Sequence, residues 1–264
     1  MSIPSNYEFF LTKVPELSPA GGRILDYGCG KGTLVEEGIR RKIDFWGCEL
    51  FGSGSGTAIR QELRQKGLLD ERVREISEGT IPFPDSFFDL VVSNQVFEHV
   101  PSLSAPLEEI ARTLKPSGKL LCVFPTMECY RDHAGTLFAH KFAPYSKAQY
   151  YNLLFFRLLG FGRLKKGRGT PREWTNFFVN WLAQNTWYRS HNEIHEAFNK
   201  YFVTYQHVEE EYLSFRLKEK GWNLAANLAH IPFGKLFFRW VVTRWGGVVL
   251  LAEKSSGNEI TVAI

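Results

Sequence analysis

The chain has 264 residues, enough for one large domain or one domain with a sizeable insertion, and its 44% hydrophobic and 23% charged residues give an ordinary globular balance. The formal net charge of +4 is compatible with an anionic substrate or a membrane surface, and is no evidence by itself for a nucleic-acid partner. Cys29, Cys48, Cys122 and Cys129 show neither C-x-x-C pairing nor zinc spacing, so we interpret them as reduced, inert thiols of a cytoplasmic protein.

The first half of the chain alternates strand and helix patterns. A leading helix is predicted from Ser5, which has capping-box spacing with Glu8, to Pro15, which should end it. Apolar runs predict strands at residues 23–26, 44–49, 73–77, 88–93 and 119–124. Helical patterns lie between them at residues 33–41 and 57–66 and from about Pro106 to Leu114. This alternation implies a parallel sheet with helices on both faces.

Beyond Thr126 the pattern changes to aromatic helices. Ser146 with Gln149, and Ser190 with Glu193, have the spacing of helix caps. The predicted elements are helices at about 147–159, at 173–187 and after residue 190, a strand at 201–208, a helix at 210–220 and a strand at 248–253. The tail after residue 254 is polar and then alternating, which fits either a loose end or an edge strand.

A glycine turn between the first strand and helix organises the chain. Residues 23–33 read RILDYGCGKGT, so the strand ends at Asp26 and Gly28, Gly30 and Gly32 follow before the helix. Glycine allows positive φ and a close ligand approach, and the helix start presents free N–H groups. Thr33 has capping-box spacing with Glu36, which predicts the helix start at Thr33. Together these features predict a nucleotide-binding corner.

Three known nucleotide-binding motifs can be compared with this stretch. The dinucleotide fingerprint G-x-G-x-x-G fails because Gly32 comes one residue early. The phosphate loop fails because Leu25 stands where its first glycine should be. The remaining match, Asp-x-Gly-x-Gly-x-Gly, resembles the class I methyltransferases that use S-adenosylmethionine. A plain glycine-rich turn in any α/β domain is the alternative.

The resemblance covers residues 1 to about 125 well and the last strand moderately. It implies an α/β fold with a Rossmann-like, seven-stranded, mostly parallel sheet of order 3-2-1-4-5-7-6, the last strand antiparallel, and a helical cap insertion. The corresponding domains would be a cofactor-binding core at residues 1–125, a cap at 126–200 and a C-terminal part completing the sheet at 201–264. Within the class, the block EGTIPFPDSFFDLVVSNQVFEHV at residues 78–100 looks most like the ubiquinone-biosynthesis branch.

The resemblance also implies a set of residues for S-adenosylmethionine. Glu49, at the end of the second strand, would hold the ribose hydroxyls, and Asp26 would orient the turn and the amino group of the cofactor. All the candidates fall at carboxyl ends of strands, where ligands of such sheets bind. The predicted cofactor-binding residues are Asp26, Gly28, Cys29, Gly30, Glu49, Leu50, Glu78, Gly79, Asn94 and Gln95.

Histidines supply the candidates for a general base. His133 and His140 lie just after the fifth strand, and His99 follows the fourth, where it competes with a purely structural role. We rank them His133, His140, His99. A metal site at His133 and His140 is not predicted, because no third ligand is obvious and the two are not spaced i, i+4. The basic loop at residues 163–172 fits a solvated turn or a phosphate-binding segment.

The sequence thus predicts an S-adenosylmethionine-dependent methyltransferase acting on a small acceptor that is polar, sugar-like or lipid-linked, by O- or N-methylation. No nucleic-acid partner is expected, since no basic helix with base-reading residues is visible. The alternative is a non-catalytic methyltransferase-like binding module or a peripheral membrane protein, because residues 231–245 mix aromatic with basic residues. A helix packed before the last strand is the favoured interpretation of that segment. The N-terminus lacks the pattern of a signal peptide.

Overall fold

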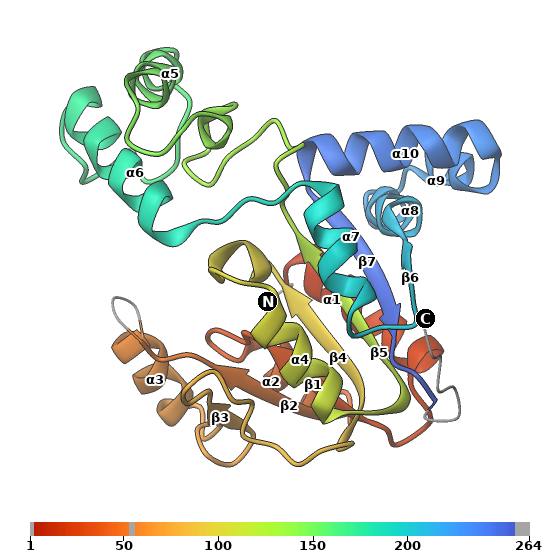
Figure 1. Cartoon of the computed structure of the whole chain (residues 1–264). Helices are drawn as coiled ribbons and strands as arrows, with labels where there is room; N and C mark the ends of the chain where they lie inside the picture. The colour runs from red at the N-terminus through yellow and green to blue at the C-terminus, as the bar shows by residue number, and fades with distance from the viewer. Residues whose placement is uncertain (1–2, 53–55, 257–264) are drawn as a thin grey trace, which may run out of the picture.

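A computed structural model describes residues 3–52 and 56–256, and it contains a seven-stranded sheet of order β3-β2-β1-β4-β5-β7-β6 (Figure 1). The first five strands pair in parallel, and β7 runs antiparallel to both β5 and β6. The predicted fold and strand order are therefore confirmed. The strands are β1 Arg23–Tyr27, β2 Asp44–Glu49, β3 Val73–Glu75, β4 Phe88–Asn94, β5 Leu114–Phe124, β6 Thr204–His207 and β7 Val248–Glu253.

Helices connect these strands and extend beyond the sheet. The α-helices are α1 Ser5–Leu17, α2 Thr33–Arg40, α3 Gly56–Gln65, α4 Ser104–Thr113, α5 Lys147–Leu158, α6 Pro171–Asn185, α7 His191–Asn199, α8 Glu209–Glu219, α9 Asn223–Ala226 and α10 Pro232–Trp245. The described residues also form the short 3-10 helices η1 Phe97–His99, η2 Ala139–Lys141 and η3 Asn227–His230. The predicted tail beyond residue 256 lies outside the described residues.

Alternating side chains of the strands form two cores, one on each face of the sheet. On one face, Leu25 and Val91 pack in a cluster that also takes in side chains from α4 and α7. On the other, Ile24 and Leu90 pack in a cluster with side chains from α1, α2, α3, α8 and α10. Strands buried on both faces explain the continuous apolar runs of the sequence. The helices of both layers hold the carboxyl ends of β1, β2 and β4 in fixed positions.

Three local predictions were wrong. The helix α1 continues through Pro15 to Leu17, because the burial of Phe9, Phe10 and Val14 holds it against the sheet, and Ser5 makes no side-chain cap. The helix α2 begins at Thr33 as predicted, but the capping box inferred there was wrong. The N-cap of this helix is Gly32 in the left-handed region at φ 70°, and the hydroxyl of Thr33 makes no cap.

The third error concerns β5, which was predicted to begin at residue 119 and begins at Leu114. Its register against β4 shifts between the pairs Phe88–Leu114 and Leu90–Lys119, so residues 115–118 lie inside the strand as an irregularity. Regular pairing resumes at Lys119, where the apolar run that signalled the strand also begins.

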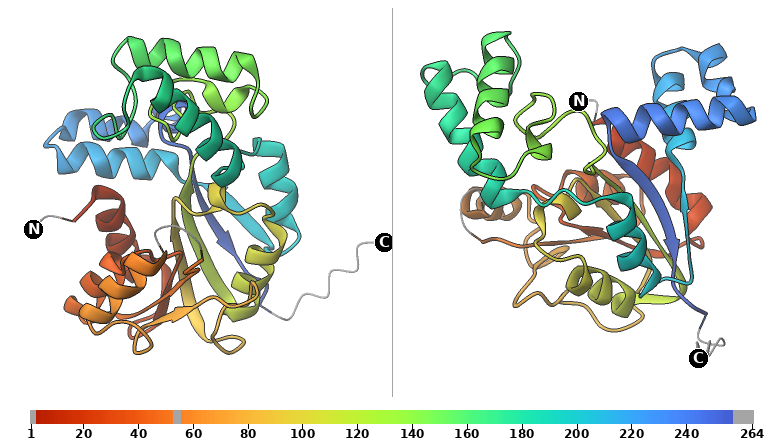
Figure 2. Two further views of the ribbon diagram at one scale, coloured as in Figure 1. Left: turned by 90° about the vertical axis from the view of Figure 1, so that its left-hand side faces the viewer. Right: turned by 45° about the horizontal axis from the view of Figure 1, so that its top comes forward.

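The helices α5 and α6 stand beyond the carboxyl ends of the parallel strands and form an upper lobe (Figures 1 and 2). They pack on each other through a small core of their own that includes Leu153, Trp174 and Phe178. The following helix α7 returns to the sheet, where Ile194 and Phe198 join the main core. The division at residues 125 and 200 stays a prediction. Across the described residues, no helix is both long enough and apolar enough to cross a bilayer.

Candidate active site

The glycine turn after β1 is fastened to the end of β2. The backbone N–H groups of Gly28 and Cys29 both donate to the carbonyl of Cys48, at 2.9 and 3.1 Å. Glu49 then accepts from the backbone N–H of Gly30 at 2.6 Å and from that of Leu50 at 2.9 Å. Burial raises the pKa of Glu49, and these two hydrogen bonds oppose the rise.

Two glycines of the turn serve different purposes. At Gly28, φ is 74° and a Cβ would lie 2.4 Å from Cγ2 of Val96, so a side chain is excluded by packing. At Gly30, φ is 52° and a Cβ would meet nothing within 4 Å, so this backbone faces open space. A ligand can therefore approach the chain closely at Gly30.

Asp26 lies under the turn and is 3% exposed. Its burial, and then the nearby charge of Glu49, raise the pKa of Asp26 to about 8. The phenol of Tyr7, on α1, is close enough that Asp26 and Cys29 add to the effect of burial in raising the pKa of Tyr7 to about 12. Tyr7 was not foreseen, because its place beside Asp26 depends on how α1 packs across the sheet.

The other predicted cofactor residues lie along the same edge. The side-chain oxygen of Asn94, at the end of β4, accepts from the amide of Asn6 on α1 at 3.0 Å. Gln95 follows with φ 59° and donates its backbone N–H to the carbonyl of Val123 at 2.7 Å. Glu78 and Gly79 are exposed in the turn after β3, on the far side of β2 from the glycine turn. Asp26 and Asn94 thus lie at the carboxyl ends of the neighbouring strands β1 and β4, next to the glycine turn. Glu78 and Gly79 lie farther out, beyond the end of β3.

Of the three predicted histidines, the structure brings two together. The rings of His99 and His133 meet edge to face with centroids 4.9 Å apart. Between them lies Glu98, whose Oε1 is 3.4 Å from Nε2 of His133 and 3.9 Å from Nε2 of His99. Glu98 was not predicted; its acidic side chain beside His99 was visible in the sequence, but its 1% exposure was not.

Neighbouring groups fix both rings. Nδ1 of His99 lies 2.6 Å from the carbonyl oxygen of Asn185, and Nδ1 of His133 lies 2.7 Å from the hydroxyl of Tyr188. The guanidinium of Arg189 donates to the carbonyl of Phe97 at 2.9 Å, which steadies η1. Both histidines therefore turn their Nε2 atoms toward Glu98.

His140 occupies a different place. It packs against Tyr188, with ring centroids 4.3 Å apart and ring planes tilted by 31°, and it lines a separate cavity of about 320 Å³. Burial lowers the pKa of His140, and the charge of Asp132 partly opposes this. His140 is thus set apart from His99 and His133, which share another cavity.

That second cavity measures about 610 Å³ and opens between η1 and the upper lobe. Besides His99 and His133, its walls carry Arg168, Phe177 and Trp181. The guanidinium of Arg168 lies 3.8 Å from the centroid of Phe177. Arg163 also lines the cavity, so the basic loop supplies two cations to an otherwise aromatic wall. Such walls suit a flat or apolar ligand that carries an anionic group.

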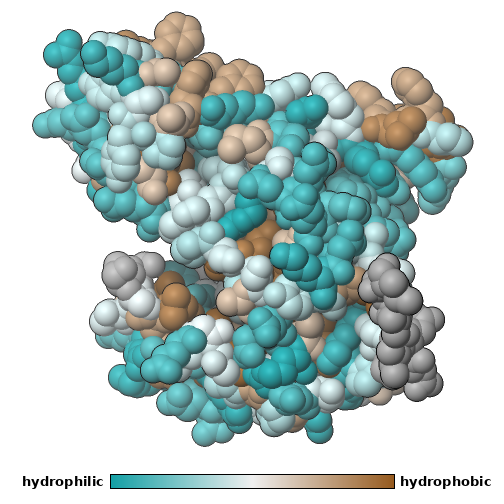
Figure 3. Space-filling view, in the orientation of Figure 1, coloured by the Kyte–Doolittle hydropathy of each residue, from teal (hydrophilic) through white to brown (hydrophobic). Residues whose placement is uncertain are grey.

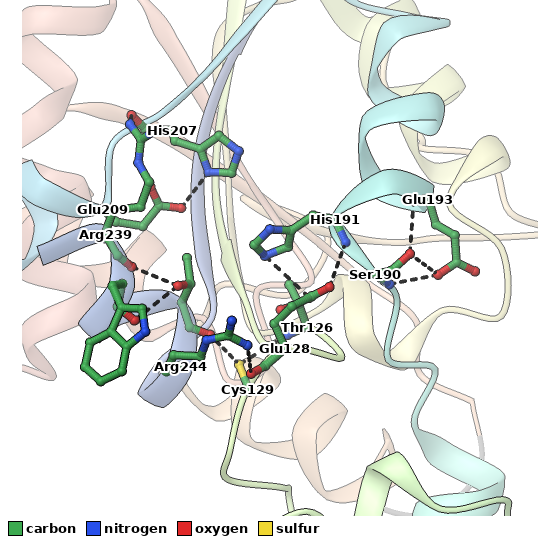
Figure 4. Close-up of polar contacts among 12 residues, drawn as sticks. Thr126, Glu128, Cys129, Ser190, His191, Glu193, His207, Glu209, Arg239 and Arg244 are labelled. Atoms are coloured by element: carbon green, nitrogen blue, oxygen red, sulfur yellow. Dashed lines mark hydrogen bonds and ion pairs between the residues drawn. The ribbon is translucent and has the colours of Figure 1, made fainter. Parts of the chain in front are cut away.

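The chain after β5 is held by α10 and by the start of α7 (Figure 4). The thiol of Cys129 donates to the carbonyl of Thr243 at 3.3 Å, and the guanidinium of Arg244 donates to the carbonyl of Glu128 at 3.1 Å. The carboxylate of Glu128 accepts from the backbone N–H of His191 at 3.2 Å. These contacts fix the start of the segment that carries His133 into the cavity of about 610 Å³.

Sequence similarity to known proteins extends over about half of the chain. A family model described as a methyltransferase domain matches residues 3–159, more than half of the chain. Two curated relatives are ubiquinone biosynthesis O-methyltransferases. That of Xanthomonas euvesicatoria is 33% identical over 117 residues, which cover 44% of this chain and 47% of the relative. That of Psychrobacter cryohalolentis is 33% identical over 129 residues, which cover 48% of each. The chain thus spans about half the length of the curated relatives it matches.

Solved structures show the same fold. An S-adenosylmethionine dependent methyltransferase from Mesorhizobium loti aligns with a TM-score of 0.54 at 15% identity, covering 95% of this chain and 98% of that one. The YcgJ protein of Bacillus subtilis aligns with a TM-score of 0.51 at 14% identity, with the same coverage of 95% and 98%.

Proposed function

The chain belongs to the class I methyltransferases, whose cofactor is S-adenosylmethionine, and we propose that it methylates a small acceptor that is polar, sugar-like or lipid-linked. The observation that carries this proposal is the cavity of about 610 Å³ beside the glycine-turn edge, with its cationic, aromatic and imidazole walls. The cofactor supplies a methyl group already activated on a sulfonium sulfur. What remains for the protein is to bind, to orient, to exclude water and to take a proton.

The residues around the turn fit the cofactor. Gly30 faces open space, so its backbone can contact a ligand. Glu49 ends β2 with its carboxylate at the turn and is placed to accept hydrogen bonds from ribose hydroxyls. The buried Asp26 would face a cationic amino group, which would favour its ionised form. We assign Gly28, Cys29, Leu50, Asn94 and Gln95 to the same site, with Glu78 and Gly79 at its outer side.

The cavity supports an anionic acceptor. Arg163 and Arg168 are the cations on its wall, and Phe177 and Trp181 offer faces for an apolar or aromatic body. An oxygen nucleophile would need a proton acceptor, and His133 lies in this cavity with His99 beside it. His140 lines the other cavity, and we now rank it last.

Exposed apolar side chains favour a lipid-linked acceptor. The helix α10 packs on the core through Val242, and Phe238 is also buried, yet Phe233 is 79% exposed and Leu236 67%. Figure 3 shows hydrophobic surface at the outer end of the α8–α10 region. Basic residues interleave with these side chains, a combination that suits a membrane surface. A peripheral membrane protein without catalysis is the second candidate, and the glycine turn with Glu49 argues against it.

The experiment is to incubate the purified protein with cofactor labelled in the methyl group and with fractionated cell extracts, and to identify the labelled product. Label in a small organic-soluble or anionic compound supports the proposal. Label in nucleic acid or in bulk protein contradicts the acceptor class. Cofactor binding with no product from any fraction would favour the non-catalytic candidate.

A further inference from the structure

A buried carboxylate beside the proposed acceptor cavity lacks the partner that its burial demands. Glu98 is 1% exposed, and neither of its carboxylate oxygens accepts a hydrogen bond from the residues that the structure describes. A buried, ionised carboxylate is costly unless a cation or several donors compensate it. Glu98 lies on the short 3-10 helix η1, and the described residues supply no hydrogen-bond donor that would compensate the burial of its carboxylate.

Two imidazoles converge on the same carboxylate. One ligand atom each from Glu98, His99 and His133 can be chosen so that all lie within 4.8 Å of one another. Oε1 of Glu98 is 3.4 Å from Nε2 of His133 and 3.9 Å from Nε2 of His99. Ligands at about 2.0–2.1 Å from a tetrahedral ion lie roughly 3.3 Å apart. Glu98 and His133 are already at that spacing, whereas Glu98 and His99 must approach by about 0.6 Å, and the widest pair of the set by up to about 1.5 Å.

The outer hydrogen bond of His99 fixes its tautomer, and that of His133 is compatible with the same one. The carbonyl of Asn185 can only accept, so Nδ1 of His99 carries a proton and donates to it. The hydroxyl of Tyr188 accepts the backbone N–H of His133 and lies 2.7 Å from Nδ1 of the same residue. When that hydroxyl accepts from Nδ1 of His133 as well, both neutral rings turn a lone pair at Nε2 toward Glu98. In the other tautomer the hydroxyl donates to Nδ1, and Nε2 of His133 carries a proton that faces Glu98. A partner at the far ring nitrogen is the usual second shell of a metal-bound histidine.

Three lone-pair atoms that converge in this way repel one another unless a cation lies between them. We propose that Glu98, His99 and His133 bind a divalent transition-metal ion such as Zn²⁺, with the remaining coordination position open to the cavity of about 610 Å³. Two imidazoles and one carboxylate suit zinc and its neighbours better than Mg²⁺ or Ca²⁺, which prefer oxygen ligands. Three protein ligands with an open position are typical of a reactive site and not of a closed structural one.

This inference does not rest on the methyl-transfer proposal, but it changes the role of the two histidines if both hold. A histidine whose Nε2 holds a metal cannot take a proton there. An acceptor hydroxyl bound at the open position would instead lose its proton to solvent more readily, because a divalent cation lowers the pKa of a coordinated oxygen. Protonation of one imidazole, which would make a simple ion pair with Glu98, is the competing arrangement.

The test is direct metal binding by the full chain, without any turnover assay. The purified protein is stripped with a chelator and titrated separately with ZnCl₂, MnCl₂ and MgCl₂ by calorimetry, and bound metal is counted after dialysis. We expect one Zn²⁺ per chain, a rise in Tm on addition of Zn²⁺, and much weaker binding of Mg²⁺. Glu98→Gln keeps the shape of the side chain and should weaken Zn²⁺ binding by at least about 100-fold.

The chain offers a matched control. Glu128 also faces a histidine, with 3.4 Å from its Oε2 to Nε2 of His191, but within the described part of the chain it belongs to no group of three possible ligands. Glu128→Gln should leave the affinity unchanged. Should Glu98→Gln fail to fold, His99→Asn removes a ligand that is less buried. The inference is overturned if the folded wild-type protein retains no stoichiometric metal, if it binds Mg²⁺ alone, or if these ligand variants bind Zn²⁺ as well as the wild type does.

Discussion

The backbone N–H of Gly30 donates to Oε2 of Glu49 at 2.6 Å, which ties the turn after β1 to the last residue of β2. The other oxygen of the carboxylate accepts the N–H of Leu50 at 2.9 Å, so the acid is oriented before any ligand arrives. Two segments that are separated by α2 in the chain thus form one rigid corner. This corner is the part of the structure from which cofactor binding follows.

The buried Asp26 predicts a pH dependence of stability. Its pKa is raised from 3.8 to about 8, so the folded protein holds this proton more tightly than the unfolded chain does. The contribution of Asp26 to the free energy of unfolding is therefore most favourable below pH 4. It decreases as the pH rises toward 8, by up to about 1.4 kcal/mol per pH unit. Asp26→Asn should raise the Tm of the ligand-free protein at pH 8 more than at pH 5.

Thermal unfolding over this pH range checks the prediction, with the exposed Asp85→Asn as the control variant. S-adenosylhomocysteine should reduce the benefit of Asp26→Asn, because its amino group would favour the carboxylate. An equal change in Tm at pH 5 and pH 8 would show that Asp26 does not hold its proton in the fold.

The acceptor cavity predicts different effects for the histidines. Once an acceptor is known, His133→Ala should lower turnover by roughly two to four orders of magnitude, whether the residue takes a proton or holds a metal. Affinity for S-adenosylhomocysteine should barely change, because the cofactor residues lie at β1, β2 and β4. His140→Ala should cost much less, since its ring packs on Tyr188 outside that cavity. Steady-state kinetics with calorimetry separates the effects, and near-normal turnover of His133→Ala would remove it from the reaction.

The basic loop predicts a binding effect for an anionic acceptor. Arg168→Ser should raise KM by roughly tenfold or more with a smaller change in kcat, because a charge-assisted hydrogen bond is worth about 1.5–3 kcal/mol. Lys166 lies on the same loop but not on the cavity wall, so Lys166→Ser is the control. If both variants raise KM equally, the loop acts only through its general charge, and added salt should then abolish the difference from wild type.

The exposed side chains of α10 predict reversible binding to membranes. The protein should sediment with vesicles that contain anionic lipid, and the double change Phe233→Ser and Leu236→Ser should reduce the bound fraction severalfold. Phe238 is 2% exposed and belongs to the packed side of the helix, so its change would test folding and not docking. If the wild-type protein does not sediment with anionic vesicles, the exposed side chains of α10 do not bind membranes.

Much of the fold could be predicted because apolar runs encode strands buried on both faces. Residues 44–49 and 248–253 were predicted as strands with the bounds that β2 and β7 have, and the strand order followed from the family resemblance. Local signals failed where packing overrides them. Pro15 stays helical because Phe9, Phe10 and Val14 on the same helix are buried against the sheet. Gly32 takes the cap position that capping-box spacing assigned to Thr33.

The acceptor side of the site was harder to predict. His99 follows β4 and His133 follows β5, and only the fold brings their rings together. The sequence suggested His133 with His140 as a pair, but Tyr188 stands between them in space. Nothing in the sequence reveals that Glu98 is buried, because burial there depends on residues 185–189 closing over η1.

The most direct test of the central claim is calorimetric titration of the purified protein with S-adenosylhomocysteine. The account predicts one site per chain, and a loss of affinity of roughly tenfold to a hundredfold for Glu49→Gln, since two ribose hydrogen bonds to a charged group are weakened. Glu75→Gln, which changes the acid at the end of the neighbouring strand β3, should bind as the wild type does. Binding of NAD with no response to S-adenosylhomocysteine, or equal affinity in Glu49→Gln and wild type, would contradict it.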